Sequence, residues 1–495
     1  MSDVRVTYSG LTNFVLSMVG IITGLIFILI ITRTVSPQEF GTWNLISNLI
    51  FYVIIVEPII SFWATRETAR GGKTGKTAIL SSGVFSLGAI FVYIILADFM
   101  GFQTDANAQV LIFGAILIPA TFLNYTLTGI NLGWKPHAIG YSRIVFGITE
   151  IIAALIFVYY LDWGVSGIII CATLGYVFSI TILSIYAREK ITNPIKRKFL
   201  KVWLKRFWLP LYPEIGSLLK TLDVLIFTII TGSVIGLAFW TAATTISTVV
   251  GNSRTISEAM YAKLLQGDRS GILQENLIHM FYFAFPLTAI SIIFAKPGLF
   301  ALNPIYETAA LIVILLTFRV FLFTLSVIFQ NFIRGIENVD TYEKSTLRDF
   351  IKSKLFSIPT VVLIQAAIHV TALTIGLLLL SDRPMMDLLT YWASVELVVQ
   401  IPFTIYFFII LKRNISFNLD LKSLFKYLLS AIGIFGLVYI LLEEYLVYKA
   451  EIVEFLPNIL LFLGIGVSSY LILTYFIDDR IKRLFHAIIH EIGNR

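Results

Sequence analysis

Ionisable side chains inside long apolar segments are the residues of this sequence best placed to do chemistry. A charge in hydrocarbon is costly unless it is paired or hydrated, so such residues usually serve a function. We favour the interpretation that they line a water-filled cavity, the alternative being internal salt bridges that only lock helices together. The set comprises Glu57, Glu150, Glu214, Lys220, Asp223, Arg319, His369 and Glu396.

Three of these residues fall within one predicted helix. Lys220 and Asp223 are three positions apart and can pair along one helical face. Glu214 follows Pro213, and Pro210 comes just before, which predicts a kink or a loosened first turn. Such a helix suits the wall of a water-filled cavity.

Two further members of the set have more local interpretations. Glu57 precedes Pro58 deep in an apolar segment, and proline removes a backbone hydrogen bond there. This pattern predicts either a gate or ion site, or a packing kink in which Glu57 bonds to a neighbouring helix. His369 has no His or Cys near it in the sequence, which favours a hydrogen bond between helices over metal ligation.

Motifs of enzymatic chemistry are absent from the sequence. The stretch RGGKTGKT, from Arg70 to Thr77, looks like a phosphate-binding loop, but Gly71 is one residue too close to the Gly-Lys-Thr triplet. We find no nucleophile elbow, no paired catalytic carboxylates and no metal-ligand spacing. We therefore expect a protein that is not an enzyme and that needs no metal or cofactor.

The elements that must position these side chains are membrane-spanning helices. Of the 495 residues, 57% are hydrophobic and only 14% are charged. The apolar residues form runs long enough to cross a hydrocarbon core about 30 Å thick, where only helices satisfy every backbone polar group internally. We predict fourteen spans, at 9–32, 42–64, 78–98, 108–132, 142–161, 165–187, 208–231, 234–252, 277–296, 306–330, 356–380, 388–411, 424–443 and 457–477.

The distribution of basic residues predicts the orientation of these spans. If the N-terminus is cytoplasmic, 31 of the 37 Lys and Arg residues fall in inner segments or at the inner ends of spans, 4 fall in outer loops or at an outer span end, and 2 lie deep within spans. This asymmetry follows the positive-inside rule and places both termini in the cytoplasm. It also accounts for the net charge of +7 without a nucleic-acid partner. The single cysteine, Cys171, excludes an intramolecular disulfide, and we expect no cleavable signal peptide before the first span.

The basic stretch between the sixth and seventh spans predicts a linker between two lobes. Its apolar residues, among them Phe199 and Trp203, share one helical face, and its Lys and Arg residues share the other. This pattern is typical of an amphipathic helix in the cytoplasmic interface, where plain positive-inside anchoring is the simpler role. The predicted parts are an N-lobe at 1–187, this linker at 188–206, a C-lobe at 207–415, two further helices within 416–477 and an amphipathic cytoplasmic tail at 478–495.

Three short segments resemble a known transporter family. The stretch RTVSPQEFGTW, from Arg33 to Trp43, resembles the turn after the first helix of polysaccharide flippases in the multidrug/oligosaccharidyl-lipid/polysaccharide (MOP) exporter superfamily. GINLGWKP (129–136) and FWLPL (207–211) are similar to that family's turn after the fourth helix and to the start of its seventh. The chain departs from the family pattern at Gln38, where a Glu is usual, and after Gly232, where a second Gly-Pro-Glu copy is missing.

This resemblance, to the polysaccharide transporter or O-antigen flippase (Wzx-like) family, implies both a fold and a function. It implies an all-α integral membrane protein with two pseudo-symmetric six-helix lobes around a central cavity, plus two C-terminal helices. It also implies a multi-pass cell-membrane flippase that moves a polyprenyl-(pyro)phosphate-linked oligosaccharide by alternating access. Its partners would be that substrate, membrane lipids and proteins of glycan biosynthesis.

The intramembrane charges then suggest roles in such transport. Lys220, Arg319 and Arg33 are the predicted contacts of the substrate phosphate, because cations lower the cost of moving an anionic headgroup. The acidic residues are predicted to bind a coupling proton or cation, to line the cavity, or to pair with the bases in an empty site. They are Glu57, Glu214, Asp223, Glu150 and Glu396.

Other functions remain open at this point. A cation-coupled multidrug exporter of the same superfamily would favour a more apolar cavity with one dominant acidic site, whereas this chain carries intramembrane cations as well. A membrane-embedded glycosyltransferase would need a sizeable extramembrane loop with catalytic acids, and the longest predicted outer loop, Glu443 to Glu454, has only about a dozen residues. A non-transporting scaffold would leave the buried charges unexplained.

Overall fold

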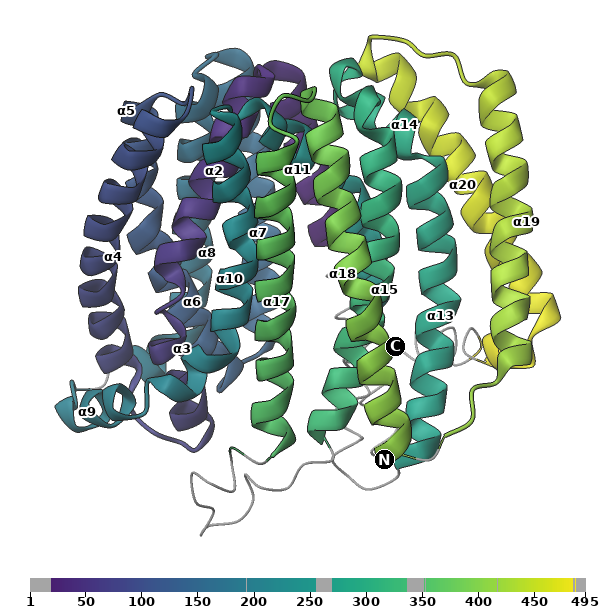
Figure 1. Cartoon of the computed structure of the whole chain (residues 1–495). Helices are drawn as coiled ribbons and strands as arrows, with labels where there is room; N and C mark the ends of the chain where they lie inside the picture. The colour runs from purple at the N-terminus through teal and green to yellow at the C-terminus, as the bar shows by residue number, and fades with distance from the viewer. Residues whose placement is uncertain are drawn as a thin grey trace. The chain divides into compact units, whose positions relative to one another are not determined.

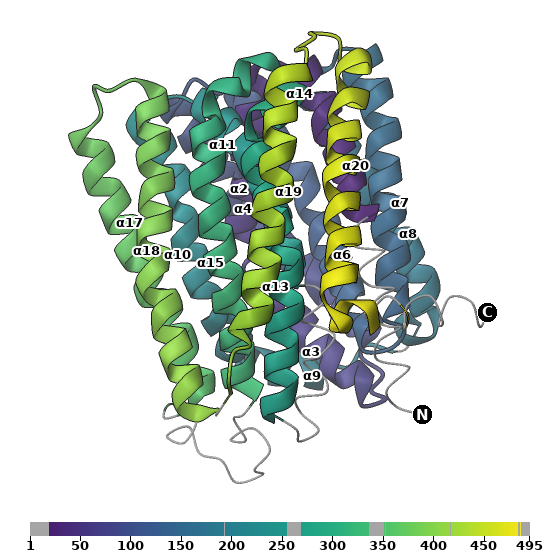
Figure 2. The ribbon, with the colours of Figure 1, turned by 90° about the vertical axis from the view of Figure 1, so that its right-hand side faces the viewer.

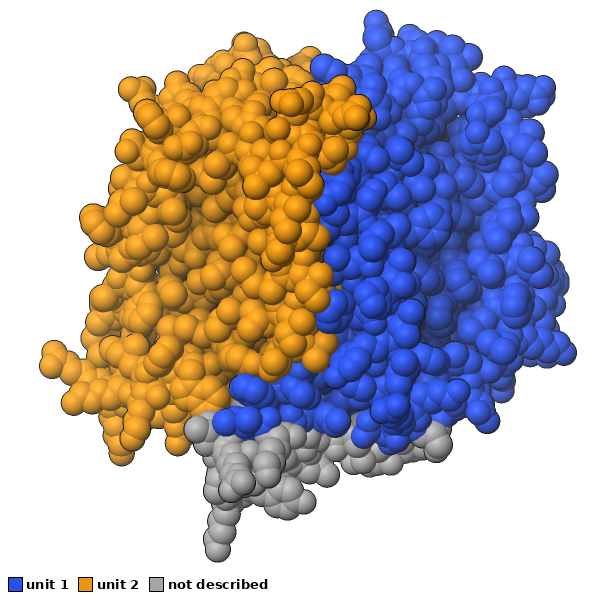
Figure 3. Space-filling view, in the orientation of Figure 1, with its two compact units in different colours: residues 1–15, 242–358, 389–495 blue, residues 16–241, 359–388 orange. Residues whose placement is uncertain are grey.

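The structure, a computed structural model, describes residues 19–192, 194–254, 269–335, 351, 353–415, 417–483 and 486, and those residues form helices and no strand. They group into two compact units, coloured in Figure 3. Unit 2 comprises residues 16–241 and 359–388, and unit 1 comprises residues 1–15, 242–358 and 389–495. The segment at 207–241 and most of α17 thus belong to the same unit as the first six predicted spans.

Unit 2 begins with the helix Val19–Thr34. The helices that follow it are α2 (Pro37–Ile54), α3 (Pro58–Ala69), α4 (Gly75–Gln103), α5 (Ala108–Phe113), η1 (Gly114–Ile116), α6 (Leu117–Leu132), α7 (His137–Ala153), the π-helix η2 (Ala154–Tyr160), α8 (Gly164–Ile191), α9 (Arg197–Lys205), α10 (Trp208–Thr231), the first half of α11 (Ile235–Ser247) and most of α17 (Lys354–Leu379). Figure 1 shows α4 running the length of this unit.

Unit 1 contains the remaining described helices. They are the end of α11, η3 (Thr248–Ser253), α13 (Arg269–Ile293), α14 (Ala295–Leu302), η4 (Pro304–Ala309), α15 (Ala310–Gly335), most of α18 (Met385–Asn414), α19 (Leu421–Tyr445) and α20 (Ile452–Ile477). Figure 2 shows α19 and α20 alongside α13. The predicted tail at 478–495 lies mostly outside the described residues.

Ten described helices are long and apolar enough to cross a membrane. The pair α2 and α3 is an eleventh candidate, bent by 61° where the two helices meet. Three other predicted spans coincide with the shorter helix Val19–Thr34, with α10, which carries three ionisable residues, and with α11. The structure therefore supports a multi-pass membrane protein, while the count of fourteen spans stays a prediction.

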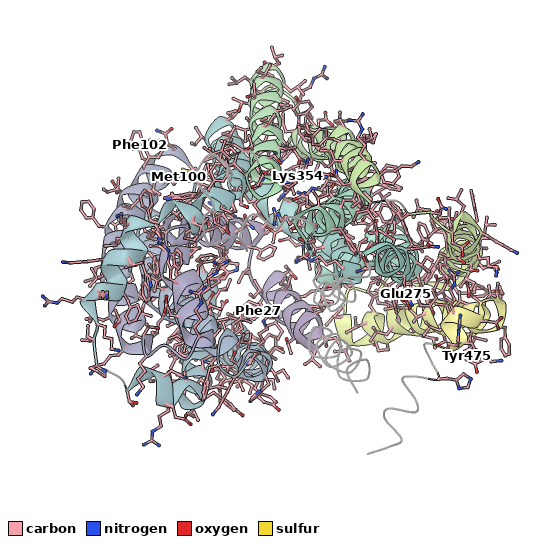
Figure 4. The ribbon with its side chains drawn as sticks, turned by 90° about the horizontal axis from the view of Figure 1, so that it is seen from below. Phe27, Met100, Phe102, Glu275, Lys354 and Tyr475 are labelled. Carbon is pink, nitrogen blue, oxygen red and sulfur yellow. The ribbon has the colours of Figure 1, made fainter. Side chains whose placement is uncertain are left out.

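The outer faces of the helices are apolar, as contact with lipid requires. On α4, Met100 is 1% exposed whereas Phe102, two residues on, is 87% exposed (both are labelled in Figure 4). Phe91 and Leu87 on the same helix are also more than two-thirds exposed. A soluble protein rarely exposes apolar surface on this scale, because each exposed ring or branched chain in water forgoes about 1.5–3 kcal/mol of burial free energy.

The start of α2 shows why its residues form this element. The Ser36 hydroxyl accepts a hydrogen bond from the Glu39 backbone N–H, and the Glu39 carboxylate accepts one from the Ser36 N–H, which makes a capping box with Pro37 at the first turn. Gly41 lies against the backbone carbonyl of Val234, where any Cβ would collide. This family-like motif is therefore a capping and packing device.

The turn between α10 and α11 is held by the loop that follows α4. The Asp105 carboxylate accepts hydrogen bonds from the Ser233 hydroxyl and the Val234 N–H, both at 2.9 Å. Gln38 donates to the Asp105 carbonyl at 3.0 Å, so the glutamine that departs from the family pattern has a structural partner. Gly232, with φ of 65°, ends α10 in the left-handed conformation that glycine adopts at little cost.

In unit 1, three tyrosines dock α19 and α20 onto α13. The Tyr470 hydroxyl donates to the Tyr282 carbonyl at 2.9 Å, and the Tyr427 hydroxyl donates to the Asp478 carboxylate at 2.9 Å. All three rings are at most 2% exposed.

At the start of α19, burial alone would raise the pKa of Asp420, but hydrogen bonds from Ser423 and the nearby Arg480 guanidinium lower it overall.

Candidate functional site

In unit 2, Asp223 of α10 meets His369 of α17. The Asp223 Oδ2 and His369 Nε2 atoms are 3.4 Å apart, and the two side chains are 8% and 3% exposed. Figure 1 shows the two helices side by side. The contact is an ion pair when His369 is protonated and a polar contact when it is neutral. Gain or loss of one proton therefore changes the strength of a buried link between α10 and α17.

Polar residues of α2 face the same region of α10. The Tyr52 hydroxyl donates to the backbone carbonyl of Thr221, and Asp223 acts electrostatically on that hydroxyl. One and two turns earlier, Asn48 and Asn44 follow at four-residue spacing, and Asn44 Nδ2 donates to Thr241 Oγ1 at 2.5 Å. The polar residues of α2 thus contact α10 at Thr221 and the middle of α11 at Thr241.

Glu57 lies at the break between α2 and α3. It is 1% exposed, and its carboxylate accepts a hydrogen bond of 2.9 Å from the Thr126 hydroxyl of α6. Pro58 begins α3, and the helix direction changes by 61° at this point. The sequence left a gate and a hydrogen-bonded kink open; the kink and the bond are both present, and transport through the site remains a prediction.

The other predicted residues of unit 2 are half-buried. Lys220 and Glu214 both lie on α10, and Glu214 is within electrostatic range of Tyr125 on α6. Glu150 lies on α7, one turn before the π-helix, and a Cβ on Gly175 of α8 would come within 3.1 Å of its side chain. Arg33 lies near the end of the helix Val19–Thr34.

In unit 1, Arg319 of α15 and Glu396 of α18 form a tight buried ion pair. Arg319 Nε is 2.6 Å from Glu396 Oε2, and the side chains are 17% and 6% exposed. The guanidinium also lies over the Phe323 ring, with Cζ 4.9 Å from its centroid. Its two remaining nitrogens are the donors that a phosphate or carboxylate would engage bidentately.

Further along the same two helices lies a buried polar triad. Gln400 donates from Nε2 to Ser326 Oγ at 3.0 Å and to Thr404 Oγ1 at 3.1 Å. Next to it, and sharing Thr404, an open apolar pocket of about 240 Å³ lies between α13, α15 and α18, with Phe329 and Phe408 in its lining. An apolar lining of this kind suits part of a hydrocarbon chain.

Sequence reasoning identified the charged residues but not their partners. A Lys220–Asp223 pair along one helix stays a prediction, and the contact of Asp223 with His369, on a helix far along the chain, was not foreseen. Sequence reasoning did not single out Tyr52, Thr126 or Gln400, because uncharged polar side chains are common in membrane helices and carry little signal alone. The four-residue spacing of Asn44, Asn48 and Tyr52 was the available clue.

Solved structures of other proteins share this fold. No family model matches the sequence, and no curated protein matches it. Solved structures do match: an inward-facing multidrug resistance MATE family transporter of the MOP superfamily (13% identity, 80% of this chain and 96% of that one, TM-score 0.61) and the lipid II flippase MurJ in an inward closed conformation (14%, 94% and 98%, 0.58). A MOP superfamily transporter from Pyrococcus furiosus, described as having a binding pocket of reversed polarity, matches at 14% identity over 83% of this chain and 98% of that one, with a TM-score of 0.57.

These similarities agree with the helices and the buried charges described above. The structural matches establish a shared architecture. At identities of 13–14% they leave the substrate undefined. The neighbours are transporters, and their coverage runs through nearly the whole of their own chains. The chain thus has the fold of the MOP superfamily transporters.

Proposed function

We propose that this protein is a flippase that moves a polyprenyl-(pyro)phosphate-linked oligosaccharide across the cell membrane by alternating access. The observation that carries the proposal is the buried Arg319–Glu396 pair, because a guanidinium held by one carboxylate can exchange it for a phosphate of the same charge sign. Lys220, half-buried on α10 of unit 2, is the other cation that the sequence predicts to contact the substrate phosphate. The basic residues of the predicted inner segments favour cytoplasmic termini.

Two further observations support a lipid-linked substrate. The lipid II flippase covers a larger share of this chain than the MATE transporter does. The apolar pocket in unit 1 provides a surface for a hydrocarbon chain next to the polar triad, with which it shares Thr404. The acidic residues Glu57, Asp223 and Glu214 then serve as sites for a coupling proton or cation.

The second candidate is a cation-coupled multidrug exporter, and the fold shared with a MATE transporter favours it. Such a protein would bind cationic or neutral drugs, for which Glu396 rather than Arg319 would be the useful partner. The two functions therefore assign opposite partners of one ion pair to the substrate.

The test is transport in reconstituted vesicles by an Arg319→Gln/Lys220→Gln variant. We expect flipping of a fluorescent polyprenyl-pyrophosphate-linked oligosaccharide to be abolished, because both headgroup cations are lost. The control is Arg383→Gln/Lys449→Gln, which removes the same charge from exposed positions and should leave the rate unchanged. Full flipping by the first variant would end this assignment, and uptake of a cationic drug in the same vesicles would identify the exporter.

A further inference from the structure

The short helix α9 is strongly basic, with four Lys or Arg residues among its nine. Arg197, Lys201 and Lys205 follow one another at four-residue spacing, so they share one face, and Lys198 flanks them. All four side chains are exposed, and no acidic residue occurs between Lys190 and Pro213. We call these four residues the basic face of α9.

The opposite face of α9 is fixed firmly to unit 2. Trp203 is 1% exposed and packs in a core cluster with Trp63 of α3 and Ala78 of α4. The Lys196 N–H donates to the Thr77 hydroxyl at the start of α4 at 2.9 Å. The basic face is therefore held in place by α3 and α4, and Figure 1 shows α9 at the end of the unit where α4 begins.

Apolar side chains border the basic face. Val202 and Leu204 are 40% and 43% exposed, and Phe207 and Trp208, at the start of α10, are 48% and 40% exposed. An acidic protein segment would complement the charges but would leave these four side chains in water. A lipid interface accommodates both, because headgroups meet the Lys and Arg residues while Phe and Trp reach the level of the acyl chains.

We infer that the basic face of α9 is a docking surface for the headgroups of anionic phospholipids. The partner is the membrane leaflet itself, recognised by its phosphate charge, with Val202, Leu204, Phe207 and Trp208 in its interfacial layer. The surface is separate from the buried residues assigned to the substrate. It anchors the segment that joins α8 to α10. Helix α10 carries Glu214, Lys220 and Asp223.

The test compares lipid binding by the full-length protein and two triple variants, using native mass spectrometry with phosphatidylglycerol or phosphatidylcholine. Lys198→Gln/Lys201→Gln/Lys205→Gln removes three charges from the basic face. Lys412→Gln/Arg413→Gln/Lys422→Gln removes three charges from exposed positions of unit 1 and is the matched control. Both variants change the net charge from +7 to +4.

We expect the unmodified protein to bind phosphatidylglycerol in preference to phosphatidylcholine, and increasingly weakly as salt screens the attraction. A Lys near an anionic surface strengthens binding about fivefold, so the α9 variant should bind phosphatidylglycerol about a hundredfold more weakly. The control should bind much as the unmodified protein does. Unchanged binding by the α9 variant, or an equal loss in both variants, would overturn the inference; the former would point to an acidic protein partner.

Discussion

At the scale of single residues, three buried ionisable side chains each contact a group on another helix. Arg319 meets Glu396, Asp223 meets His369, and Glu57 accepts from Thr126. Removing one member of such a pair strands the other in a medium that solvates it poorly, which costs more than the pair itself contributes. Residues at these positions therefore influence stability and transport together.

Glu396→Gln isolates this effect. The change leaves the Arg319 guanidinium buried without its counter-charge, so we expect the free energy of unfolding in detergent to fall by about 3–5 kcal/mol. Thermal unfolding followed by tryptophan fluorescence would measure it. Glu454→Gln breaks an exposed pair with Lys449, 49% and 52% exposed, and should cost no more than about 1 kcal/mol. Equal shifts in the two variants would contradict the prediction.

At the scale of elements, close backbone contact determines how the helices meet. Gly41 allows α2 to touch the carbonyl of Val234, while Gly129 and Gly133 of the second family-like segment lie against the backbone of α3. The segments that resemble the flippase family are thus places where helices approach closely. In these two segments the glycines allow close packing of helix backbones.

Gly41→Ala tests this close contact. The new Cβ would overlap the Val234 carbonyl, and moving backbone apart typically costs about 1–3 kcal/mol. The matched control is Gly83→Ala in α4, where nothing lies within 4 Å and the better helix propensity of alanine favours the folded state by up to about 1 kcal/mol. Unfolding temperatures should therefore move in opposite directions, and a stabilised Gly41→Ala protein would refute the contact.

At the scale of the whole molecule, the placement of basic residues predicts which side of the membrane each loop occupies. The loop between α3 and α4 contains Arg70 and Lys73, Lys76 follows in the first turn of α4, and the loop is predicted to be cytoplasmic. The turn between α17 and α18 contains Asp382 and is predicted to be outside. Cys171 is fully buried and is the chain's single cysteine, so its replacement by alanine gives a background for labelling.

In that background, Asp382→Cys should react with a membrane-impermeant maleimide added to intact cells, and Lys73→Cys should not. Both positions are exposed, so both should react once the cells are permeabilised, which serves as the internal control. The reverse labelling pattern would show that the predicted topology is inverted. It would also place the basic face of α9 on the outer surface, since α9 packs against the ends of α3 and α4.

Hydropathy and charge along the chain were enough to predict a helical membrane protein with ionisable residues inside its apolar segments. Hydropathy and charge are properties of consecutive residues, so runs such as Gly75–Gln103 identify their own environment. Glu57, Asp223 and Arg319 could be recognised in the same way, because a charge within an apolar run is visible in the local sequence. Short motifs indicated the superfamily fold that solved structures share.

The partner of each buried charge, by contrast, depends on how separate helices pack. Arg319 and Glu396 lie on different helices, as do Asp223 and His369, and no periodicity along the chain relates two such positions. Likewise, the contact of Trp203 with α3 and α4 turns a generic basic linker into a fixed surface. These pairings arise from how separate helices pack, because the cost of a buried charge depends on its neighbours in space.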